Sequence, residues 1–267
     1  MTIQPRKRFG QHFLRDESII ARIIDALSPK PSDNLIEIGG GRGALTFPLL
    51  QQAHALTVIE LDRDLVLELE TQKPPASRLV IHSADALQFD FATLKKDERL
   101  LRIFGNLPYN VTTPLIFHVL QYAPIIADML FMVQKEVAMR LVAENRNKNY
   151  GRLSVMVQYH CQAELLFDVP PDAFYPPPKV TSSIVRLVPH NPYPDSAKNM
   201  HLLERLVKFA FSQRRKTLRN SLSIMMPKEL WSHIPIDPNL RPEQITVQDF
   251  VMISNTLWKA QQSLSTS

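Results

Sequence analysis

The feature that most constrains this chain is a glycine cluster that directly follows an apolar segment. Residues 34–38 have the pattern of a buried strand, and residues 39–43 contain four of the seven glycines in the chain. A helix-like segment comes next, at residues 44–52. Glycines at a strand-to-helix turn let the backbone approach a ligand closely. The pattern therefore predicts an α/β fold with a ligand bound at this turn.

A carboxylate follows the next predicted strand, at residues 55–59. Glu60 stands 21 residues after Gly39, where an acidic side chain can bind both hydroxyl groups of a ribose. The two features together predict a cofactor that contains a nucleoside. Gly39, Gly41 and Ala44 also satisfy the looser dinucleotide-binding pattern, so the glycines alone leave NAD and S-adenosylmethionine as competing cofactors.

Three further residues at predicted strand ends favour S-adenosylmethionine. Glu37 precedes Gly39 by two residues and completes the E-x-G-x-G-x-G form common in methyltransferases. We expect it to serve the amino-acid part of the cofactor, directly or through water. Asp85 follows a strand at 79–82 and can accept a hydrogen bond from an adenine amino group, although a helix-capping role fits it equally well. The fourth strand brings Asn106 to the same edge.

The segment Asn106-Leu107-Pro108-Tyr109 suggests alkylation of an exocyclic amine on a flat ring. Such a nitrogen is a poor nucleophile, because its lone pair is delocalised, and acceptors on its N–H groups favour the reactive form. The side-chain oxygen of Asn106 and the carbonyl of Leu107 can be those acceptors. Pro108 fixes the backbone, and Tyr109 offers a face on which a base can stack. An ordinary turn after a strand is the alternative.

The bulk properties are those of a two-domain protein without disulfides. Its 267 residues predict a large domain at 1–190 and a small helical domain at 200–267. Cys161 is the single cysteine, which suits a reducing compartment and a buried position. The apolar run at 125–133 contains Asp128 and is too short to cross a membrane. The eight histidines lack ligand spacing, so we expect no metal, and we expect a cytoplasmic monomer.

The remaining pattern predicts further strands at 126–133, 153–159 and 182–188, and helices that begin near residues 16, 114, 134, 200 and 246. Strands and helices that alternate in this way are typical of a Rossmann-like, doubly wound, mostly parallel sheet with an antiparallel edge. This is the fold class of class I methyltransferases, and we expect an all-helical domain to follow it.

Two basic segments are candidates for RNA contact. Arg146, Lys148 and Arg152 belong to an amide-rich loop. We expect a second cluster in the helix that begins near Met200, and its cations are Lys208, Arg214, Arg215, Lys216 and Arg219. Solvated surface is the alternative for both segments, but a net charge of +5 permits a polyanionic partner. The proline-rich segment 174–180 is either a spacer or a rigid loop that holds the ring of Phe174 against an extruded base.

These motifs together resemble the ribosomal RNA adenine dimethyltransferase family, and most closely its bacterial small-subunit branch. The resemblance runs from about Arg6 to Val188 and is weaker after that. The matching motifs are Phe9–Leu14, Glu37–Gly43, Glu60–Asp62, Asp85, Asn106–Tyr109, Gln134–Glu136, Tyr150–Ser154 and Phe174–Val180. The chain departs from the family at His12, where Asn is usual, and at Gly40, where Pro is common.

The resemblance implies dimethylation, from S-adenosylmethionine, of N6 on two adjacent adenosines in the 3′-terminal hairpin of 16S rRNA, within a pre-30S particle. The implied cofactor contacts are His12, Leu14, Gly39, Glu60, Asp85 and Asn106. The implied target-base contacts are Asn106, Leu107, Tyr109 and Phe174. Two rival functions stay open: methylation of a single large-subunit adenosine with macrolide resistance, and a binding checkpoint in ribosome assembly.

Overall fold

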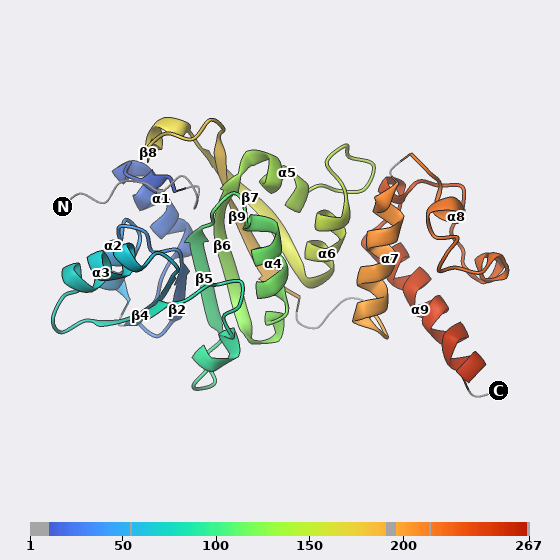
Figure 1. Cartoon of the computed structure of the whole chain (residues 1–267), viewed down its shortest axis with the longest axis horizontal. Coiled ribbons are helices and arrows are strands. Elements are labelled where there is room, and N and C mark those ends of the chain that lie inside the picture. Colours follow the sequence, from blue (N-terminus) through green and yellow to red (C-terminus); the bar gives the residue numbers. More distant parts are fainter. Residues whose placement is uncertain (1–10, 54, 191–195, 214, 266–267) are drawn as a thin grey trace. The chain divides into compact units, whose positions relative to one another are not determined.

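The computed structural model describes residues 11–53, 55–190, 196–213 and 215–265 (Figure 1). These residues form two compact units. The first lies within Met1–Ala138 and Ala163–Pro189, and the second within Met139–Gln162 and His190–Ser267. The second unit thus includes residues 139–162, which the sequence analysis placed in the first domain. The functional domain limits 1–190 and 200–267 stay a prediction.

The first unit is built on a seven-stranded sheet in the order β4-β3-β2-β5-β6-β9-β7. Strands β2 to β6 pair in parallel, and β9 pairs antiparallel with β6. The strands are β2 (Asn34–Ile38), β3 (Ala55–Glu60), β4 (Arg78–Ser83), β5 (Leu101–Asn106), β6 (Ile126–Gln134), β7 (Cys161–Val169) and β9 (Ser182–Pro189). This confirms the predicted doubly wound, mostly parallel sheet.

The strand order reverses beside β2. Strands β3 and β4 lie on one side of it, and β5 and β6 lie on the other. In open α/β sheets a ligand binds outside the carboxyl ends of the strands at such a switch point. The topology therefore places a binding crevice between the ends of β2 and β5, where residues 38–41 and 106–109 leave the sheet.

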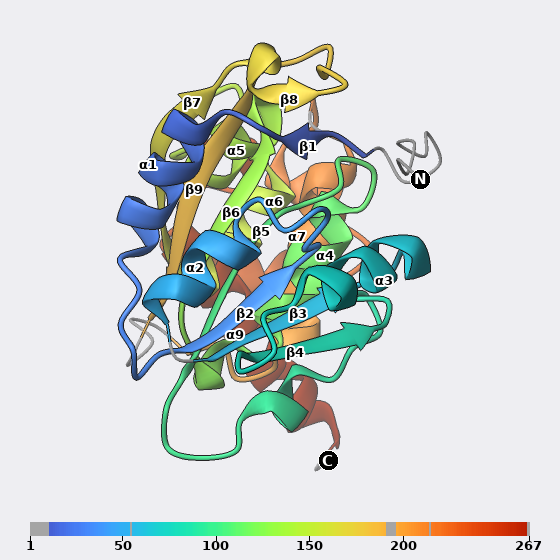
Figure 2. The ribbon, with the colours of Figure 1, turned by 90° about the vertical axis from the view of Figure 1, so that its left-hand side faces the viewer.

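Helices cover the parallel strands, which explains their nearly continuous apolar runs. The helices of the first unit include α1 (Glu17–Leu27), α2 (Thr46–Gln52), α3 (Arg63–Gln72) and α4 (Thr112–Leu120), and α5 (Lys135–Leu141) leads toward the second unit. Helices α1 and α2 share one apolar core with Phe104 and Ile184. A separate pair of short strands, β1 (Phe13–Leu14) and β8 (Phe174–Tyr175), lies beside the main sheet (Figure 2).

Helix α1 shows how local sequence sets an element. Asp16 caps its N-terminus, because the side chain accepts hydrogen bonds from the backbone N–H groups of Ser18 and Ile19. The apolar face buries Ile19, Ile23, Ile24 and Leu27. At the other end, Ser28 adopts a left-handed conformation with φ of 47° and closes the helix.

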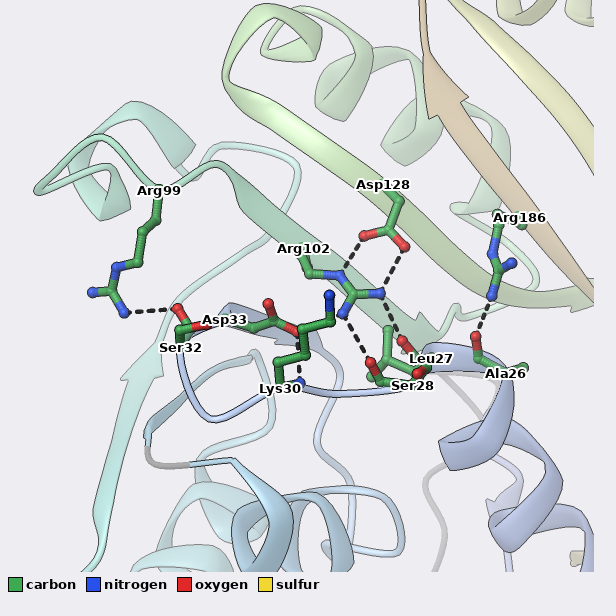
Figure 3. Close-up of polar contacts among 10 residues, drawn as sticks. All are labelled: Ala26, Leu27, Ser28, Lys30, Ser32, Asp33, Arg99, Arg102, Asp128 and Arg186. Atoms are coloured by element: carbon green, nitrogen blue, oxygen red, sulfur yellow. Dashed lines mark hydrogen bonds and ion pairs between the residues drawn. The ribbon is translucent and has the colours of Figure 1, made fainter.

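A partly buried ion cluster ties the end of α1 to the start of the sheet (Figure 3). The guanidinium of Arg102 donates to both carboxylate oxygens of Asp128, at 2.7 and 2.9 Å, and to Asp33 at 2.5 Å. It also donates to the carbonyl of Leu27 at 2.6 Å, and Arg186 donates to the carbonyl of Ala26. A positively charged donor near a helix C-terminus forms hydrogen bonds to the last carbonyl groups and interacts favourably with the negative end of the helix dipole.

One predicted strand is wrong. Residues 153–159 belong to helix α6 (Arg152–His160), and strand β7 begins only at Cys161. The helix is buried on more than one side, at Val155, Met156, Val157 and Tyr159 among others, so its apolar residues are nearly consecutive and hide the helical period. Val and Tyr also favour strands in isolation. Ser154 supports the helix start by accepting from the backbone N–H of Gly151 at 3.1 Å.

The second unit is mainly helical, as predicted for residues 200–267. Besides α6 it contains α7 (Met200–Ser212), α8 (Leu218–Ser221) and α9 (Val247–Ser265). Asn199 caps α7 by accepting from Leu202 N at 2.9 Å, and α7 packs against α9. The ring centroids of Phe211 and Phe250 lie 5.7 Å apart in this core. No helix among the described residues is long and apolar enough to cross a bilayer.

The predicted basic helix needs a correction, because α7 ends at Ser212. Lys208 lies in α7, Arg215 and Lys216 lie in the turn between α7 and α8, and Arg219 lies in α8. Arg214 lies outside the described residues. Consecutive cations repel one another, and this segment offers no apolar residue with which to continue the packed face of α7.

Candidate functional site

The glycine cluster forms the turn between β2 and α2. Gly39, Gly41 and Gly43 have φ of 77°, 55° and 81°, in the left-handed region that residues with a Cβ rarely adopt. Gly39 N–H donates to the carbonyl of Ile59 at 2.9 Å, which ties the turn to β3. The sequence thus uses glycine here because the backbone conformation requires it.

Glu60 lies at the end of β3 and faces this turn. Its Oε2 accepts from Gly41 N at 3.0 Å, and its Oε1 accepts from Asp62 N at 2.9 Å. Burial raises the pKa of the Glu60 carboxyl, and the backbone N–H donors partly oppose that shift. The strand end therefore presents a carboxylate whose two oxygens are already oriented by main-chain groups.

Asn106 ends β5 on the opposite side of β2. Its side-chain Nδ2 donates to the carbonyl of His12 at 3.1 Å, which leaves Oδ1 as the accepting half of the amide. Leu107 N donates to Met132 O at 3.0 Å, and Thr112 Oγ1 donates to Pro108 O at 2.9 Å. The backbone of the Asn106–Tyr109 segment is thus held by the neighbouring strand β6 and by the start of α4.

Two cavities meet at these strand ends. The larger, of about 150 Å³, is lined by Gln11, His12, Phe13, Gly39, Gly41, Glu60, Leu61, Asp62, Leu65, Asn106, Pro108, Asn110 and Val111. The smaller, of about 40 Å³, is lined by Phe13, Leu14, Glu37, Gly39, Gly40, Gly41, Arg42, Ala44, Leu45 and Asn106. Asn106 lines both cavities, so its amide stands where they adjoin.

Glu37 lies beneath the glycine turn and is buried. Its Oε2 accepts from the hydroxyl of Thr46 at 2.5 Å. Burial raises the pKa of Glu37 to about 8, and the Thr46 hydroxyl opposes the shift. Burial thus favours the neutral form of this carboxyl group, which suits a hydrogen-bonding role better than that of a fixed negative charge.

The N-terminal segment crosses the cavity and contacts three other elements. Gln11 Nε2 donates to Asp62 Oδ2 at 3.0 Å. His12 is hydrogen-bonded through Nδ1 to the carbonyl of Pro176 at 2.7 Å. Strand β1 then pairs with β8, so that Leu14 lies opposite Phe174. The structure thus brings His12 and Leu14 to the glycine turn, although they are far from it in sequence.

The two predicted base-stacking rings differ in exposure. Tyr109 is half-buried, its hydroxyl is hydrogen-bonded to Ser182 Oγ at 2.7 Å, and burial raises the pKa of that hydroxyl. Phe174 is 0% exposed and belongs to the core with Leu14. Its ring is therefore closed to a base in this structure, whereas Tyr175, the next residue, is 57% exposed. Successive side chains of a strand point to opposite faces.

Leu107 and Asp85, two further predicted site residues, are placed differently. The side chain of Leu107 is buried, so any contact with substrate must come from its carbonyl, as expected. Asp85 follows β4, and its Oδ1 accepts from Leu87 N at 2.9 Å in a local turn. It lines neither of the two cavities described above. Its adenine-binding role therefore stays a prediction.

The predicted RNA-binding residues that the structure describes all lie in the second unit. Arg146, Lys148 and Arg152 are exposed, as are Arg215 and Lys216. Arg146 and Lys148 lie in a loop held by a hydrogen bond from Arg146 N to Glu243 O at 2.6 Å, and Arg146 has φ of 69°. Arg152, predicted in the same loop, is instead the first residue of α6. Within the described ranges, no cluster of His, Cys, Asp and Glu has a metal-binding arrangement.

Sequence reasoning missed several residues of the larger cavity, namely Gln11, Phe13, Leu61, Asp62 and Asn110. Leu61 carried a usable signal, since it is an apolar residue directly after the strand-end acid, and it is 49% exposed. Asp62 caps α3 by accepting from Asp64 N. It also holds Gln11, a contact across 51 residues that no local pattern predicts.

Comparison with known proteins agrees with this geometry. The family model described as "Ribosomal RNA adenine dimethylase" matches residues 3–259. A protein of Alcanivorax borkumensis named "Ribosomal RNA small subunit methyltransferase A" is 53% identical over 94% of this chain and 89% of its own length. A protein of the same name from Acinetobacter baylyi is 52% identical over 94% of this chain and 92% of its own length.

Solved structures agree in fold. A dimethyladenosine transferase from Plasmodium falciparum matches with a TM-score of 0.80 and 26% identity, over 95% of this chain and 98% of that one. The 23S rRNA methyltransferase ErmE matches with a TM-score of 0.69 and 25% identity, over 92% of this chain and 99% of that one. With the family model matched along nearly the whole chain, the protein belongs to the ribosomal RNA adenine dimethylase family.

Proposed function

We propose that this protein is an S-adenosylmethionine-dependent methyltransferase that dimethylates N6 of two adjacent adenosines in the 3′-terminal hairpin of small-subunit rRNA. Membership of the family supports the reaction, and relatives about 50% identical, named as small-subunit methyltransferases, support the substrate. The observation that carries the proposal is the position of Asn106, a residue that lines both cavities at the switch point of the sheet.

The residues around the larger cavity suit S-adenosylmethionine. The left-handed turn at Gly39 and Gly41 allows close approach of a ligand to the backbone, and the oriented carboxylate of Glu60 suits the two ribose hydroxyls. The exposed side chain of Leu61 offers an apolar surface for a purine. Glu37 supplies a protonated carboxyl beside the smaller cavity for the amino-acid part. When bound, the cofactor supplies a methyl group on a positively charged sulfur.

The chain's own groups then make the adenine amine reactive. Asn106 Oδ1 and the Leu107 carbonyl accept hydrogen bonds from the two amine hydrogens and stabilise the positive charge that develops on nitrogen. Asn106 is held for this role by its donation to His12 O at 3.1 Å. Bound S-adenosylmethionine would supply the methyl group to the amine nitrogen as its carbon–sulfur bond breaks and a neutral thioether is left. The methylated amine would then release one proton to solvent water, because the two amide oxygens orient the N–H groups but are too weakly basic to take the proton. Alignment, rather than a covalent intermediate, provides the acceleration.

The target base must leave its helix to reach these acceptors. Tyr109 is placed three residues after Asn106 and is anchored through its hydroxyl to Ser182, so its ring can receive the extruded adenine. Phe174 has its ring in the core, so its proposed contribution is to support β1 rather than to contact the base. The stacking role is therefore assigned to Tyr109.

We also propose that the C-terminal helical domain, residues 200–267, docks on rRNA phosphates within a pre-30S particle. The exposed cations Arg215 and Lys216 support this role. Arg146 and Lys148 in the loop before α6, and Arg152 at the start of α6, are exposed cations of the same compact unit. A single cysteine, buried at Cys161 with a pKa raised to about 12, fits a reducing cytoplasm. We assign the monomer as the active form.

Two alternatives are distinguishable by experiment. The similarity to ErmE makes methylation of large-subunit rRNA an alternative function. However, the sequence identity of this chain to the small-subunit relatives is about twice its identity to ErmE. Purified protein would be incubated with labelled S-adenosylmethionine and unmethylated subunits, and digested rRNA would be analysed by mass spectrometry. We expect two dimethyladenosines in small-subunit rRNA; label only in large-subunit rRNA would overturn the proposal. A checkpoint role predicts that an inactive variant still binds small subunits and blocks their maturation.

A further inference from the structure

The side chain of His12 has two contacts that a cofactor-lining residue does not need. Its Nδ1 lies 2.7 Å from the carbonyl oxygen of Pro176, and because a carbonyl only accepts, Nδ1 carries the hydrogen. Its ring lies against the ring of Tyr109, with centroids 5.6 Å apart and planes inclined by 29°. The imidazole is thus fixed at one edge by the loop after β8 and packs on the tyrosine with its face.

Tyr109 is in turn held at two points. Its hydroxyl is hydrogen-bonded to Ser182 Oγ at 2.7 Å, and Ser182 is fully buried at the start of β9. The hydroxyl bond fixes the far end of the ring but leaves the ring free to rotate about its long axis. The stacked imidazole of His12 removes that freedom, because it occupies one face of the ring.

We propose that His12 is a positioning residue for the target adenine and acts through Tyr109. By covering one face of the Tyr109 ring, the imidazole sets the tilt of the opposite face, on which the extruded adenine stacks. The hydrogen bond to Pro176 holds the imidazole itself in place. This inference rests on the proposed function, in which the adenine stacks on Tyr109. It adds His12 to the residues that position the substrate.

The backbone and side chain of His12 have separable roles. The carbonyl of His12 accepts from Asn106 Nδ2 at 3.1 Å, and this contact survives any change of the side chain. The substitution His12→Ala therefore removes the imidazole and keeps the acceptor for Asn106. Gln11 provides a matched control on the same segment, because its side chain contacts Asp62 rather than Tyr109.

The test is a double-mutant cycle on methylation of unmethylated small subunits, with His12→Ala, Tyr109→Ala and the double variant. A stacked ring and one hydrogen bond together predict that His12→Ala lowers kcat/KM for the subunits by about 10- to 30-fold. In the Tyr109→Ala background the same change should cost less than about threefold, because the ring it positions is gone. Gln11→Ala should have the same effect in both backgrounds.

Cofactor binding is measured separately, by calorimetry without RNA. Because His12 also lines the larger cavity, we expect His12→Ala to weaken S-adenosylmethionine binding as well, but by a smaller factor than the loss in kcat/KM for the subunits measured at saturating cofactor. Multiplicative effects of His12→Ala and Tyr109→Ala on kcat/KM would overturn the inference. So would a loss confined to cofactor affinity.

A second pair of variants covers the case in which His12→Ala does not fold. His12→Phe keeps a flat ring against Tyr109, whereas His12→Asn keeps a donor and removes the ring. The inference predicts higher kcat/KM for His12→Phe, and the reverse order would contradict it. A wild-type protein that fails to methylate small subunits would instead refute the proposed function, so the two failures are distinguishable.

Discussion

Replacement of Arg102 by Met tests the partly buried ion cluster that joins α1 to the sheet (Figure 3). Arg102, Asp33 and Asp128 each have only 15% of the side chain exposed. Met is close to Arg in length and keeps an aliphatic stem, but it donates no hydrogen bond. The variant Arg102→Met thus leaves Asp128 without its two guanidinium contacts, at 2.7 and 2.9 Å, and leaves the Leu27 carbonyl without its donor at 2.6 Å.

The expected loss of stability in Arg102→Met follows from the carboxylate charge that remains without its partner. Removal of one partner from a buried ion pair lowers the free energy of unfolding by about 3–5 kcal/mol, because the remaining carboxylate loses its compensation. We expect Arg102→Met near the middle of that range, since the cluster keeps 15% exposure and water can partly reach the carboxylates. The measurement is urea-induced unfolding at pH 7, followed by circular dichroism.

Arg99 supplies the matched control three residues earlier. Its guanidinium pairs with Asp97 at 2.7 Å, but these side chains are 52% and 45% exposed. An exposed pair of this kind contributes about 0–1 kcal/mol, so Arg99→Met should be nearly neutral. The double variant Arg102→Met with Asp128→Asn should recover about 1–2 kcal/mol of the loss, because one stranded charge is gone. Equal effects of Arg102→Met and Arg99→Met would refute the reasoning.

Three further predictions concern the core, the glycine turn and the RNA surface. Phe174→Ala should lower the free energy of unfolding by about 3–5 kcal/mol, whereas Tyr175→Ala, at an exposed position, should change it by less than about 1 kcal/mol in urea unfolding. The raised pKa of Glu37, about 8, means that the folded state holds an extra proton between the unfolded pKa, near 4.5, and pH 8. The contribution of that proton to the free energy of unfolding is complete below pH 4.5 and is lost as pH rises to 8, by up to about 1.4 kcal/mol per pH unit. The free energy of unfolding of Glu37→Gln, measured from pH 5 to 8, should lack this slope. Arg215→Ala with Lys216→Ala should weaken rRNA binding and reduce its log–log salt slope by about 1–2, with cofactor affinity unchanged in calorimetry.

Each of these has a clear contrary result. Equal stability losses for Phe174→Ala and Tyr175→Ala would contradict the assignment of Phe174 to the core. Parallel pH profiles of the wild-type protein and Glu37→Gln would contradict the protonated state of that carboxyl. An unchanged salt slope in the double cation variant would remove Arg215 and Lys216 from the phosphate-binding surface.

The parts of the fold that sequence predicted well are those with strong local signals. The β2 strand and the turn at Gly39–Gly43 were predictable, because a buried parallel strand is rich in apolar residues and the turn requires the left-handed conformations that glycine adopts readily. Glu60 and Asn106 were predictable as strand-end residues for the same reason. Helix α6 was not, because burial on several sides erases the helical period.

The candidate site was less predictable wherever it depends on long-range contacts. Nothing local in sequence indicates that His12 meets Pro176, 164 residues away, or that Gln11 meets Asp62. The exposure of Phe174 and Tyr175 was also undetermined, since both are aromatic and a strand of two residues has no readable alternation. Pairing of β8 with β1 decides which of the two rings faces the core.

The central claim is that the Asn106 amide makes an adenine amine reactive at the end of β5. The most direct measurement is the rate of dimethyladenosine formation in unmethylated small subunits by the wild-type protein and by Asn106→Ala, with cofactor affinity measured alongside. We expect Asn106→Ala to lose methylation by at least about a hundredfold and to keep its fold. Normal turnover by Asn106→Ala would contradict the account.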